Sequence, residues 1–583
     1  YKTLETGIEK YAALKGTLAQ GAGRLLEAFS LSDELGQLAY RVWYFPSLLY
    51  DEDQRDNAAN ARRQQVQILF ARLHQAQSWF NPELLSIPVD KVRGWMDTDE
   101  PLRLYRFAIE DLYRQQEHVL DEAGENLMSL SSRLASAPNE AYWALSTADA
   151  KFRTIALSTG EEVTVSYGQY RAILATRREQ ADREKAFRAL YGIYSASLNT
   201  YATLFNGVCQ RDWFQARARG YRTTLEAALH GDNIPTSVVE NLIETTRAGV
   251  EPLRRYHRLR RETLAVNEYH VYDFAIPLVT FDRKYEYDEV LDWIVTAVAP
   301  LGAEYQARMR EGFAGRWIDV YENDGKRSGA YSAPVYGTHP YMLLNYTDTL
   351  DDVFTLAHEM GHSMHTILSH ETQPFIYSSY TIFVAEVPST LSEALLLDYM
   401  LARSTDAAER IVLLQHAIDN ITSTFFTQVM FADFELRAHR LAEDDKPITS
   451  EILTEMYVAL LKEYYGDAVD LNDLTGVTWA RIPHFFNSPY YVYQYATCFA
   501  SAAKLAKEVT NGNEAARLRY LALLTSGGSD HPMQLLKTAG VDLSQPDTVR
   551  AIIDQLDGLV TRLEKELGDR TSSWLPSPSS ATR

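Results

Sequence analysis

Apolar residues recur at intervals of three and four positions along most of this chain, and this spacing predicts a protein built mainly from α-helices. Residues 1–135 show it as successive helical pairs, most clearly over Leu102–Leu134. The same spacing returns from Tyr167 to Arg217 and continues through several more helices to about Gly315. The pattern therefore places helices along most of the first half of the chain.

Three short regions are predicted to be extended rather than helical. Phe152–Ser158 and Glu161–Ser166 flank a Thr-Gly pair and read as a small hairpin. Tyr341–Tyr346 is an apolar, aromatic-rich run after Gly-Thr-His-Pro, which is typical of a strand. Gly329–Ser332 reads as another extended piece, in which the glycine permits close approach of the backbone.

The segment that follows these strands contains His358-Glu359-Met360-Gly361-His362. Histidines four positions apart on a helix lie one above the other, so His358 and His362 can both reach one metal ion. Glu359 lies about 100° round the helix from His358, where a carboxylate can serve as a general base without ligating the metal. Cap candidates at 348–352 and apolar residues at helical spacing after them support a helix here. The alternative is a buried helix whose histidines only satisfy core hydrogen bonds, but a chance match is expected in about 0.02 chains of this composition.

A catalytic zinc ion needs a third protein ligand and an open fourth position. The best segment to supply this ligand is Phe383–Asp398, which reads as a second amphipathic helix. Glu386 and Glu393 are seven residues apart in it and so lie on nearly the same face. Taken alone, either glutamate would more often be a solvated surface charge, since acidic residues are rarely buried without a partner. A metal ion held by the two histidines would supply that partner.

These segments resemble the thimet oligopeptidase family of zinc metallopeptidases, in its bacterial oligoendopeptidase F branch. The resemblance rests on His-Glu-Met-Gly-His-Ser-Met-His, on Ala-Glu-Val-Pro-Ser after it, and on the late segment from Arg481 to Ala500. It spans at least residues 325–545, because it extends to Gly329–Ser332, Tyr336–Asn345, Ser526–Ser529 and Ala539–Leu543.

Carried over residue by residue, the resemblance implies one zinc ion per chain, held by His358, His362 and Glu386. It makes Glu359 the base that activates a zinc-bound water for attack on the peptide bond. Glu393 becomes a residue that orients a ligand. The implied activity is hydrolysis of internal peptide bonds in short, unstructured peptides. Two histidines and a glutamate around an open site favour zinc, although cobalt or manganese could substitute in vitro.

The late, tyrosine-rich segment supplies candidates for holding the oxyanion that forms during attack. Phenol and imidazole donors aimed at that oxygen lower the barrier. The resemblance implies Tyr493 as the main donor, His484 as a further catalytic group and Tyr490 as a supporting substrate-binding residue. Tyr491 and Tyr495 are interpreted as core aromatics. Packing on a buried helix is the alternative for all four tyrosines, since the chain has 36 tyrosines and most must pack.

The two extended pieces ahead of the histidine motif are candidates for holding the peptide. A free strand edge beside the zinc helix would pair with the substrate main chain and give grip without strong side-chain selectivity. We therefore expect Gly329, Ala330, Tyr331 and Tyr341 to contact substrate. Alternatively these are ordinary sheet strands, and the sequence leaves open which edge is free.

The resemblance also implies the overall architecture. It predicts a mainly α, zincin-type peptidase that is two-lobed and closed, with a small β-sheet beside the zinc helix and a deep internal substrate channel. Along the chain we expect an N-terminal helical region over 1–150, a helical lobe with a small hairpin over 151–315, and the catalytic zinc-binding region over 316–567. The polar, proline-containing residues 568–583 are expected to form a disordered tail.

The amino-acid composition limits the kinds of partner that this protein can bind. With 46% hydrophobic and 23% charged residues the chain is ordinary soluble globular material, and a net charge of −21 disfavours binding to nucleic acid. No apolar run approaches the roughly 18 residues of a membrane span. Cys209 and Cys498 form no disulfide framework, so we expect a reduced, cytoplasmic setting. Because the chain begins at Tyr1 rather than at methionine, the sequence leaves open whether a preceding segment was removed.

Two other functions stay open from the sequence. A peptidyl-dipeptidase or carboxypeptidase would keep the chemistry but use a cationic group to fix the carboxylate at the end of the substrate. A peptide-binding or carrier protein would use zinc only structurally. Structural zinc sites are usually closed by four Cys or His ligands, whereas this chain offers three ligands and a general base.

Overall fold

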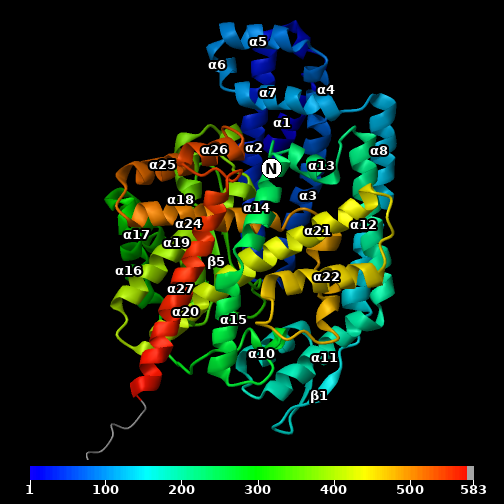
Figure 1. Ribbon diagram of the computed structural model, residues 1–583. Helices are drawn as coiled ribbons and strands as arrows, with labels where there is room; N and C mark the ends of the chain where they lie inside the picture. The colour runs from blue at the N-terminus through cyan, green and yellow to red at the C-terminus, as the bar shows by residue number, and fades with distance from the viewer. Residues whose placement is uncertain (574–583) are drawn as a thin grey trace, which may run out of the picture. The chain divides into compact units, whose positions relative to one another are not determined.

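The computed structural model describes residues 1–573, with their side chains except those of residues 122, 132–133 and 569–573. It is mainly helical, as the spacing of apolar residues predicts, and its strands form two small sheets (Figure 1). The chain divides into two compact units. Unit 1 comprises Tyr1–Val119, Arg283–Tyr399 and Leu505–Val541, and unit 2 comprises Leu120–Asp282, Met400–Lys504 and the residues from Asp542 onward.

The two units do not follow the order of the chain. The regions expected from the sequence, 1–150, 151–315 and 316–567, are consecutive, whereas each unit combines three separate stretches. Helices pack where their apolar stripes match, whatever their separation in sequence, and periodicity reveals the stripe but not its partner. The expected catalytic region is thus shared between the units, with the histidine motif in unit 1 and the tyrosine-rich segment in unit 2.

Unit 1 begins with three helices that bury their apolar faces against one another. Leu4, Leu25 and Leu69, one from each of these helices, are fully buried in their shared core. Phe29 joins the next, shorter helices to this core, since its ring stacks on that of Tyr105 at 4.3 Å. The helices of this part are α1 (Lys2–Ala12), α2 (Ala22–Glu52), α3 (Asn57–Gln77), α4 (Phe80–Leu85), α5 (Val89–Thr98), α6 (Glu100–Arg103) and α7 (Arg106–Gln115).

The rest of unit 1 contains a three-stranded sheet. Its central strand β5 (Tyr341–Tyr346) is parallel to β3 (Ile318–Tyr321) and antiparallel to β4 (Tyr331–Ala333). β4 is therefore an edge strand, and both β4 and β5 pack against helix α18 (Leu350–Thr372). The predicted strand over Tyr341–Tyr346 and the small sheet beside the motif helix are confirmed. The remaining helices of this part are α16 (Tyr287–Ala297), α17 (Ala303–Ala314), α19 (Ile382–Arg403), α25 (Glu514–Thr525) and α26 (Pro532–Ala539).

Helix α18 begins at a capping box formed by Thr349 and Asp352. The Thr349 hydroxyl accepts the Asp352 N–H at 3.3 Å, and the Asp352 carboxylate accepts the Thr349 N–H at 3.0 Å. Asp351 and Asp352 also place negative charge in the first turn, where the helix dipole favours it. The cap fixes where the helix starts, and the helix then runs without interruption through the histidine motif, as predicted.

Unit 2 is helical apart from one hairpin. Strands β1 (Thr154–Ala156) and β2 (Glu162–Thr164) pair antiparallel, which confirms the predicted hairpin with shorter strands. Helix α27 (Pro546–Ser573) includes residues that were expected to start a disordered tail, and residues 574–583 of that tail lie outside the described residues. The other helices are α8 (Glu122–Ala135), α9 (Ala137–Trp143), α10 (Tyr167–Thr176), α11 (Gln180–Ala196), α12 (Leu198–Ala218), α13 (Thr224–His230), α14 (Thr236–Ala248), α15 (Glu251–Leu264), α20 (Ala407–Ile421), α21 (Thr427–Glu443), α22 (Ser450–Tyr465), α23 (His484–Asn487) and α24 (Tyr493–Thr510).

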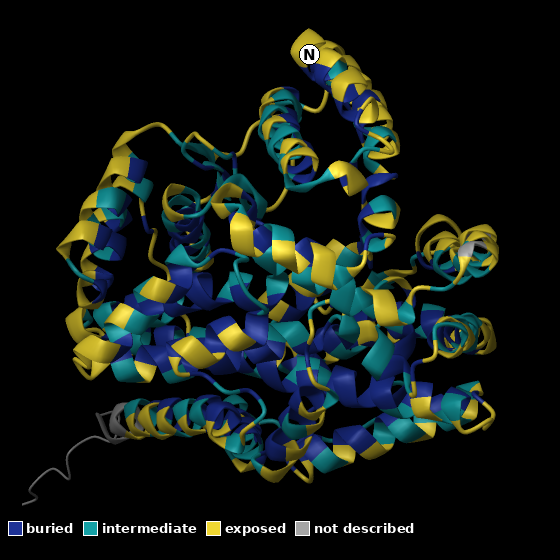
Figure 2. Cartoon of the chain, turned by 90° about the horizontal axis from the view of Figure 1, so that it is seen from above, coloured by how far each residue is buried: buried dark blue, intermediate teal, exposed yellow. Residues whose placement is uncertain are grey.

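Burial follows the faces of the helices in both units. Figure 2 shows buried positions as stripes along the helices, with exposed positions on their other sides. This is the arrangement that a three-to-four-residue apolar spacing produces. None of the described helices has the combination of length and apolar composition that a membrane span requires.

Candidate metal and catalytic centre

Three side chains from two helices of unit 1 converge on one point. His358 and His362 lie one turn apart on α18, and Glu386 lies near the start of α19. The Nε2 atoms of the two histidines are 3.2 Å apart, and Glu386 Oε2 lies 3.2 Å from the first and 3.4 Å from the second. Among the described residues, this is the only group of three or more such donors close enough to share a metal ion. The structure thus brings together the three residues predicted to bind zinc.

The spacing of these donor atoms fits a tetrahedral zinc ion. Two ligand atoms about 2.1 Å from a tetrahedral ion lie about 3.4 Å apart, in agreement with the three separations of 3.2–3.4 Å. Two imidazole nitrogens and a carboxylate oxygen are also the donor set of a class of catalytic zinc sites, which leave a fourth position open. Three electron-rich atoms this close repel one another unless a proton or a cation lies between them.

The carboxylates dominate the electrostatics of these ligands. Burial lowers the pKa of His358, but its hydrogen bonds with Glu386 and Glu393 outweigh burial and raise that pKa well above the usual value. Burial raises the pKa of Glu386, and hydrogen bonds from His358 and His362 bring it well below the usual value. The site therefore stabilises positive charge between the imidazoles and the carboxylate. A proton supplies this charge in the metal-free site, and a bound metal cation would replace that proton.

His358 is held from its other side by Glu393. The Nδ1–H of His358 donates to Glu393 Oε1 over 2.6 Å, which turns Nε2 toward the shared point. A carboxylate bonded to the second ring nitrogen is the usual way in which a metal-binding histidine is oriented. The structure therefore places Glu393 where the sequence predicted it, two turns beyond Glu386 on α19.

Ser389 is a contact that the sequence analysis missed. Its hydroxyl lies 3.0 Å from Glu386 Oε2 and also 3.0 Å from the backbone oxygen of Glu386, so it donates to this pair of acceptors. The bond restricts the rotation of the Glu386 carboxylate. Spacing could have revealed it, because residues three apart on a helix are neighbours on its surface.

Gly361, inside the histidine motif, lets α18 and α19 approach closely. A β-carbon at this position would lie 2.7 Å from the backbone oxygen of Pro388 and 2.7 Å from Cα of Ser389. Such distances are too short for a side chain without movement of the helix backbone. The glycine of the motif is thus explained by the packing of two helices, and not by a turn.

Glu359, the predicted general base, is largely buried, with 8% of its surface exposed. Burial raises the pKa of Glu359, whereas the imidazoles of His358 and His362 and a hydrogen bond from the Ser332 backbone lower it, and the net shift is upward. Ser332 belongs to β4, and its hydroxyl also lies 2.9 Å from that of Ser363 on α18. The edge strand and the predicted base are therefore in direct contact.

Three residues predicted to bind the peptide lie at or just before β4. Gly329 has φ +87°, and its carbonyl accepts a hydrogen bond from the side chain of Asn345 at 2.8 Å. Ala330 follows it, and Tyr331 begins the strand. The Tyr331 hydroxyl donates to Asp51 of α2 over 3.0 Å, so its side chain is already engaged. These residues could therefore bind a ligand mainly through their backbone N–H and C=O groups.

Tyr341, the fourth predicted substrate contact, has a different environment. It begins β5, which is paired with β3 on one side and with β4 on the other. A strand with two partners has no free edge for a peptide. The Tyr341 ring is half-buried and lies 4.5 Å from that of His339, so only its side chain could reach a substrate.

The residues predicted to hold the oxyanion, His484, Tyr490 and Tyr493, belong to unit 2, whereas the candidate metal ligands belong to unit 1. Tyr493 begins α24 and is 3% exposed, and burial strongly raises its pKa. Tyr490 has φ +58°, its hydroxyl lies 2.7 Å from that of Thr224, and its N–H donates to Glu435 at 3.2 Å. These contacts favour the packing interpretation for Tyr490.

His484 lies among tyrosines that were interpreted as core residues. Its ring stacks with that of Tyr491 at 6.1 Å and meets that of Tyr495 edge-on at 6.2 Å. All three residues are half-buried, while Tyr490 and Tyr493 are buried, so Tyr491 and Tyr495 pack around His484 but less deeply than the other two tyrosines. Burial lowers the pKa of His484, which keeps the imidazole neutral at neutral pH.

Comparison with known proteins identifies the family of this chain. Residues 173–554 match the model of peptidase family M3, and residues 83–152 match that of oligopeptidase F. Oligopeptidase PepF of Bacillus subtilis is 36% identical over 567 residues, which are 97% of this chain and 84% of that protein.

Solved structures extend the likeness to the fold. A putative peptidase from Chlamydophila abortus is 32% identical with a TM-score of 0.91, covering 97% of this chain and 96% of that one. Oligoendopeptidase-F from Enterococcus faecium is 30% identical with a TM-score of 0.75, covering 98% of each chain. The chain therefore belongs to peptidase family M3, in its oligoendopeptidase F branch, and is a metallopeptidase that acts on oligopeptides.

Proposed function

We propose that this metallopeptidase is a zinc-dependent oligoendopeptidase that hydrolyses internal peptide bonds of short, unstructured peptides. The observation that carries the proposal is the triangle of donor atoms from His358, His362 and Glu386, with sides of 3.2–3.4 Å. Glu359 lies on the same helix as two of these proposed ligands and is largely buried. A zinc metallopeptidase needs this combination of an open metal site and a base.

Zinc held by the three ligands would polarise the scissile carbonyl and lower the pKa of a water molecule. Glu359 accepts a proton from the attacking water on a carboxylate oxygen and then delivers it to the nitrogen of the leaving amine. Burial raises the pKa of Glu359, which makes it a stronger base. Glu393 and Ser389 act indirectly, because they fix the orientation of His358 and of Glu386.

The peptide is held, in this proposal, along the edge of β4. An extended substrate would add to the sheet as a further strand, using backbone groups around Gly329, Ala330 and Tyr331. Support comes from the place of β4 at the sheet edge and from its contact with the base through Ser332. Recognition through main-chain groups would let one enzyme accept many sequences. Tyr341 would contribute a side-chain contact.

Tyr493 and His484 are the proposed donors to the oxyanion, as the family resemblance implies. A neutral, half-buried imidazole such as that of His484 can donate a hydrogen bond to a negatively charged oxygen. Tyr491 and Tyr495 enter as competing donors, because both residues are only half-buried and their rings lie beside that of His484. Tyr490 remains a weaker candidate, since its hydroxyl is already bonded to Thr224.

A cytoplasmic location completes the proposal. Cys209 and Cys498 are both buried and form no disulfide. Buried thiols that serve as small apolar side chains are compatible with a reducing compartment. Short peptides are the expected partners, and the net charge of −21 argues against nucleic acid.

Metal analysis combined with peptide hydrolysis tests this function. The wild-type chain should carry one zinc ion and cleave internally quenched peptides that are blocked at both ends. His358→Ala should lose zinc and activity together, whereas Glu359→Gln should keep zinc and lose turnover by several orders of magnitude. Full zinc occupancy in the His358→Ala protein would contradict the ligand assignment. Cleavage only of peptides with a free carboxyl terminus, seen in product masses, would instead indicate a peptidyl-dipeptidase or carboxypeptidase.

A further inference from the structure

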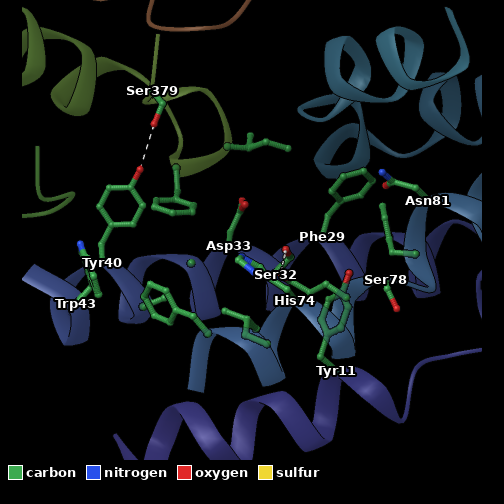
Figure 3. A pocket seen from close by; sticks show the side chains of 18 of the residues that line it. Tyr11, Phe29, Ser32, Asp33, Tyr40, Trp43, His74, Ser78, Asn81 and Ser379 are labelled. Carbon is green, nitrogen blue, oxygen red and sulfur yellow. Dashed lines mark hydrogen bonds between the residues drawn. The ribbon is translucent and has the colours of Figure 1, made fainter. Parts of the chain in front are cut away.

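Unit 1 contains a cavity of about 710 Å³ that the proposed peptidase chemistry does not use (Figure 3). Its walls come from α1, α2, α3 and the start of α4, and from the loop 373–381 that follows the motif helix. None of the proposed metal ligands or catalytic residues lines it. Its volume lies within the range of about 300–1,000 Å³ that is typical of small-molecule sites.

Large aromatic rings form much of the cavity wall. Tyr40 and Trp43 of α2, Phe70 of α3 and Phe375 of the loop are all only half-buried and line the open volume. The Tyr40 and Phe375 rings meet edge-on at 5.6 Å, and those of Trp43 and Phe70 lie 5.8 Å apart. Gly36 makes this wall possible, because a β-carbon there would lie 2.2 Å from the Phe375 ring. The sequence thus keeps aromatic surface facing a cavity instead of filling it.

One carboxylate, that of Asp33, enters this aromatic environment. With histidine counted as neutral, Asp33 is the only charged residue among those described as lining the cavity, and no lysine or arginine is among them. Figure 3 shows it rising from α2 between Phe29 and Tyr40. Its Oδ2 accepts a hydrogen bond from the Tyr105 hydroxyl at 3.0 Å.

The charge of Asp33 has no cationic partner among the described residues. Burial raises the pKa of Asp33, and the hydrogen bond from Tyr105 lowers it only in part. A half-buried carboxylate beside aromatic rings is costly to keep ionised unless a cation pairs with it. The environment therefore favours a positively charged guest.

We propose that this cavity binds an organic cation, namely an ammonium or guanidinium group carried on an aromatic or aliphatic body. Asp33 pairs with the positive charge, and the faces of Tyr40 and Trp43 attract it further through cation–π interactions. The body of the ligand packs against Phe70 and Phe375. The same chemistry is offered by a free amine and by the amino terminus or a basic side chain of a peptide.

Other classes of ligand fit the cavity less well. An anionic ligand would meet the Asp33 carboxylate with no lysine or arginine among the described lining residues to compensate for the repulsion. A purely apolar ligand would bury Asp33 further without giving it a partner. Charge and aromatic surface together therefore select a cation with an apolar body.

Calorimetric titration of the zinc-loaded, full-length protein tests the proposal with a matched series of ligands. 2-Phenylethylamine should bind at least 10-fold more tightly than the neutral 2-phenylethanol, and the anionic 3-phenylpropionate should bind more weakly still. A second comparison measures the affinity for D-Phe-D-Ala amide with a free amino terminus and for its acetylated form. D-residues are used because they resist hydrolysis. Binding of the amine alone identifies a free amine as the source, and binding of the free-terminus peptide identifies a peptide.

Two variants localise the binding. Asp33→Asn keeps the size of the side chain and an acceptor for Tyr105. It should weaken binding of 2-phenylethylamine by about 10–100-fold and leave the affinity for 2-phenylethanol unchanged. Glu34→Gln removes the same charge from the next, exposed position of α2 and should change neither affinity. Equal binding of amine and alcohol to the wild-type protein would overturn the proposal without any variant. So would an effect of Glu34→Gln as large as that of Asp33→Asn, or the absence of binding by both the amine and the free-terminus peptide.

Discussion

Gly361 of α18 lies against the backbone of Pro388 in α19, at a separation that leaves no room for a β-carbon. This contact sets how closely the two helices pack. Because His362 comes from one helix and Glu386 from the other, their separation of 3.4 Å depends on the same contact. The glycine of the histidine motif thus controls the geometry of a site that it does not itself touch.

Substitution of Gly361 by alanine should therefore affect metal binding as well as stability. The added methyl group must push α19 away, which we expect to cost about 1–3 kcal/mol and to weaken zinc binding. Gly94→Ala is the matched control, because Gly94 is exposed on α5 and a β-carbon there meets nothing within 4 Å. It should stabilise the protein by about 0.4–1 kcal/mol. A Gly361→Ala protein with normal zinc affinity would show that α19 is not held by this contact.

The residues behind the ligands should tune the metal site without abolishing it. Glu386→Ala should remove tight zinc binding, whereas Glu393→Gln should weaken zinc affinity or activity by about 10–100-fold, since it only orients His358. Ser389→Ala should have a smaller effect in the same direction, because Glu386 keeps its bonds to both histidines. Competition with a chelator measures all three affinities. The roles of the two glutamates would have to be exchanged if Glu393→Gln proved the more damaging change.

Tyr493→Phe separates catalysis from packing at the most buried of the candidate donors. As an oxyanion donor, its hydroxyl acts in the transition state, so its loss should lower kcat by roughly 10²–10³-fold with little change in KM, zinc content or melting temperature. A decrease of less than about fivefold corresponds to only about 1 kcal/mol and would exclude this role. In that case Tyr491→Phe and Tyr495→Phe, measured in parallel, would show whether a half-buried tyrosine beside His484 supplies the donor instead.

Tyr490→Phe should behave differently from these variants. Its hydroxyl is bonded to Thr224, so removal should cost about 0.5–1.5 kcal/mol of stability and leave kcat nearly unchanged. A thermal melt and a single kinetic assay on the same preparation distinguish the two effects. A large loss of kcat at unchanged stability would restore a substrate-binding role for Tyr490.

Glu435 gives unit 2 a stability that depends on pH. Burial raises the pKa of this side chain to about 8 in the folded protein. Between its usual pKa and this value the unfolded chain is ionised and the folded chain is protonated, so stability should fall as pH rises through this interval and level off above about 8. Glu435→Gln should remove this contribution and gain stability relative to wild type from pH 5 to pH 8. Glu455→Gln, at an exposed position of α22, should not, and urea denaturation of the metal-free proteins measures the difference.

The sequence allowed prediction of whatever depends on spacing within one helix or strand. The two histidines, the carboxylate next to them and the two glutamates seven apart each lie on a face that helical geometry defines. Their convergence could be expected because a catalytic metal site would take the two histidines and Glu386 as ligands, with Glu359 as the base and Glu393 as the residue that orients His358. The strand Tyr341–Tyr346 was equally local, since its composition and the preceding turn both point to extended structure.

What could not be predicted depends on contacts between distant segments. Nothing in the sequence near Gly361 indicates that Pro388 lies against it, and nothing near Tyr331 indicates its bond to Asp51. The order of burial among the tyrosines also escaped prediction, because four closely spaced aromatic residues give no clear face. The left-handed backbone at Tyr490 rotates that side chain into the core of unit 2.

All the proposed metal donors and both of their supporting residues lie between positions 358 and 393, on two helices joined by the loop 373–381. Formation of this site brings together residues that are close in sequence and so closes only a short loop. It can therefore form early in folding, before the distant segments of unit 1 have assembled. Because metal binding contributes free energy to the structure that holds it, zinc should stabilise the α18–α19 pair more than the rest of the protein. Removal of zinc should therefore speed hydrogen exchange in these two helices first, and leave α20 and α27 protected.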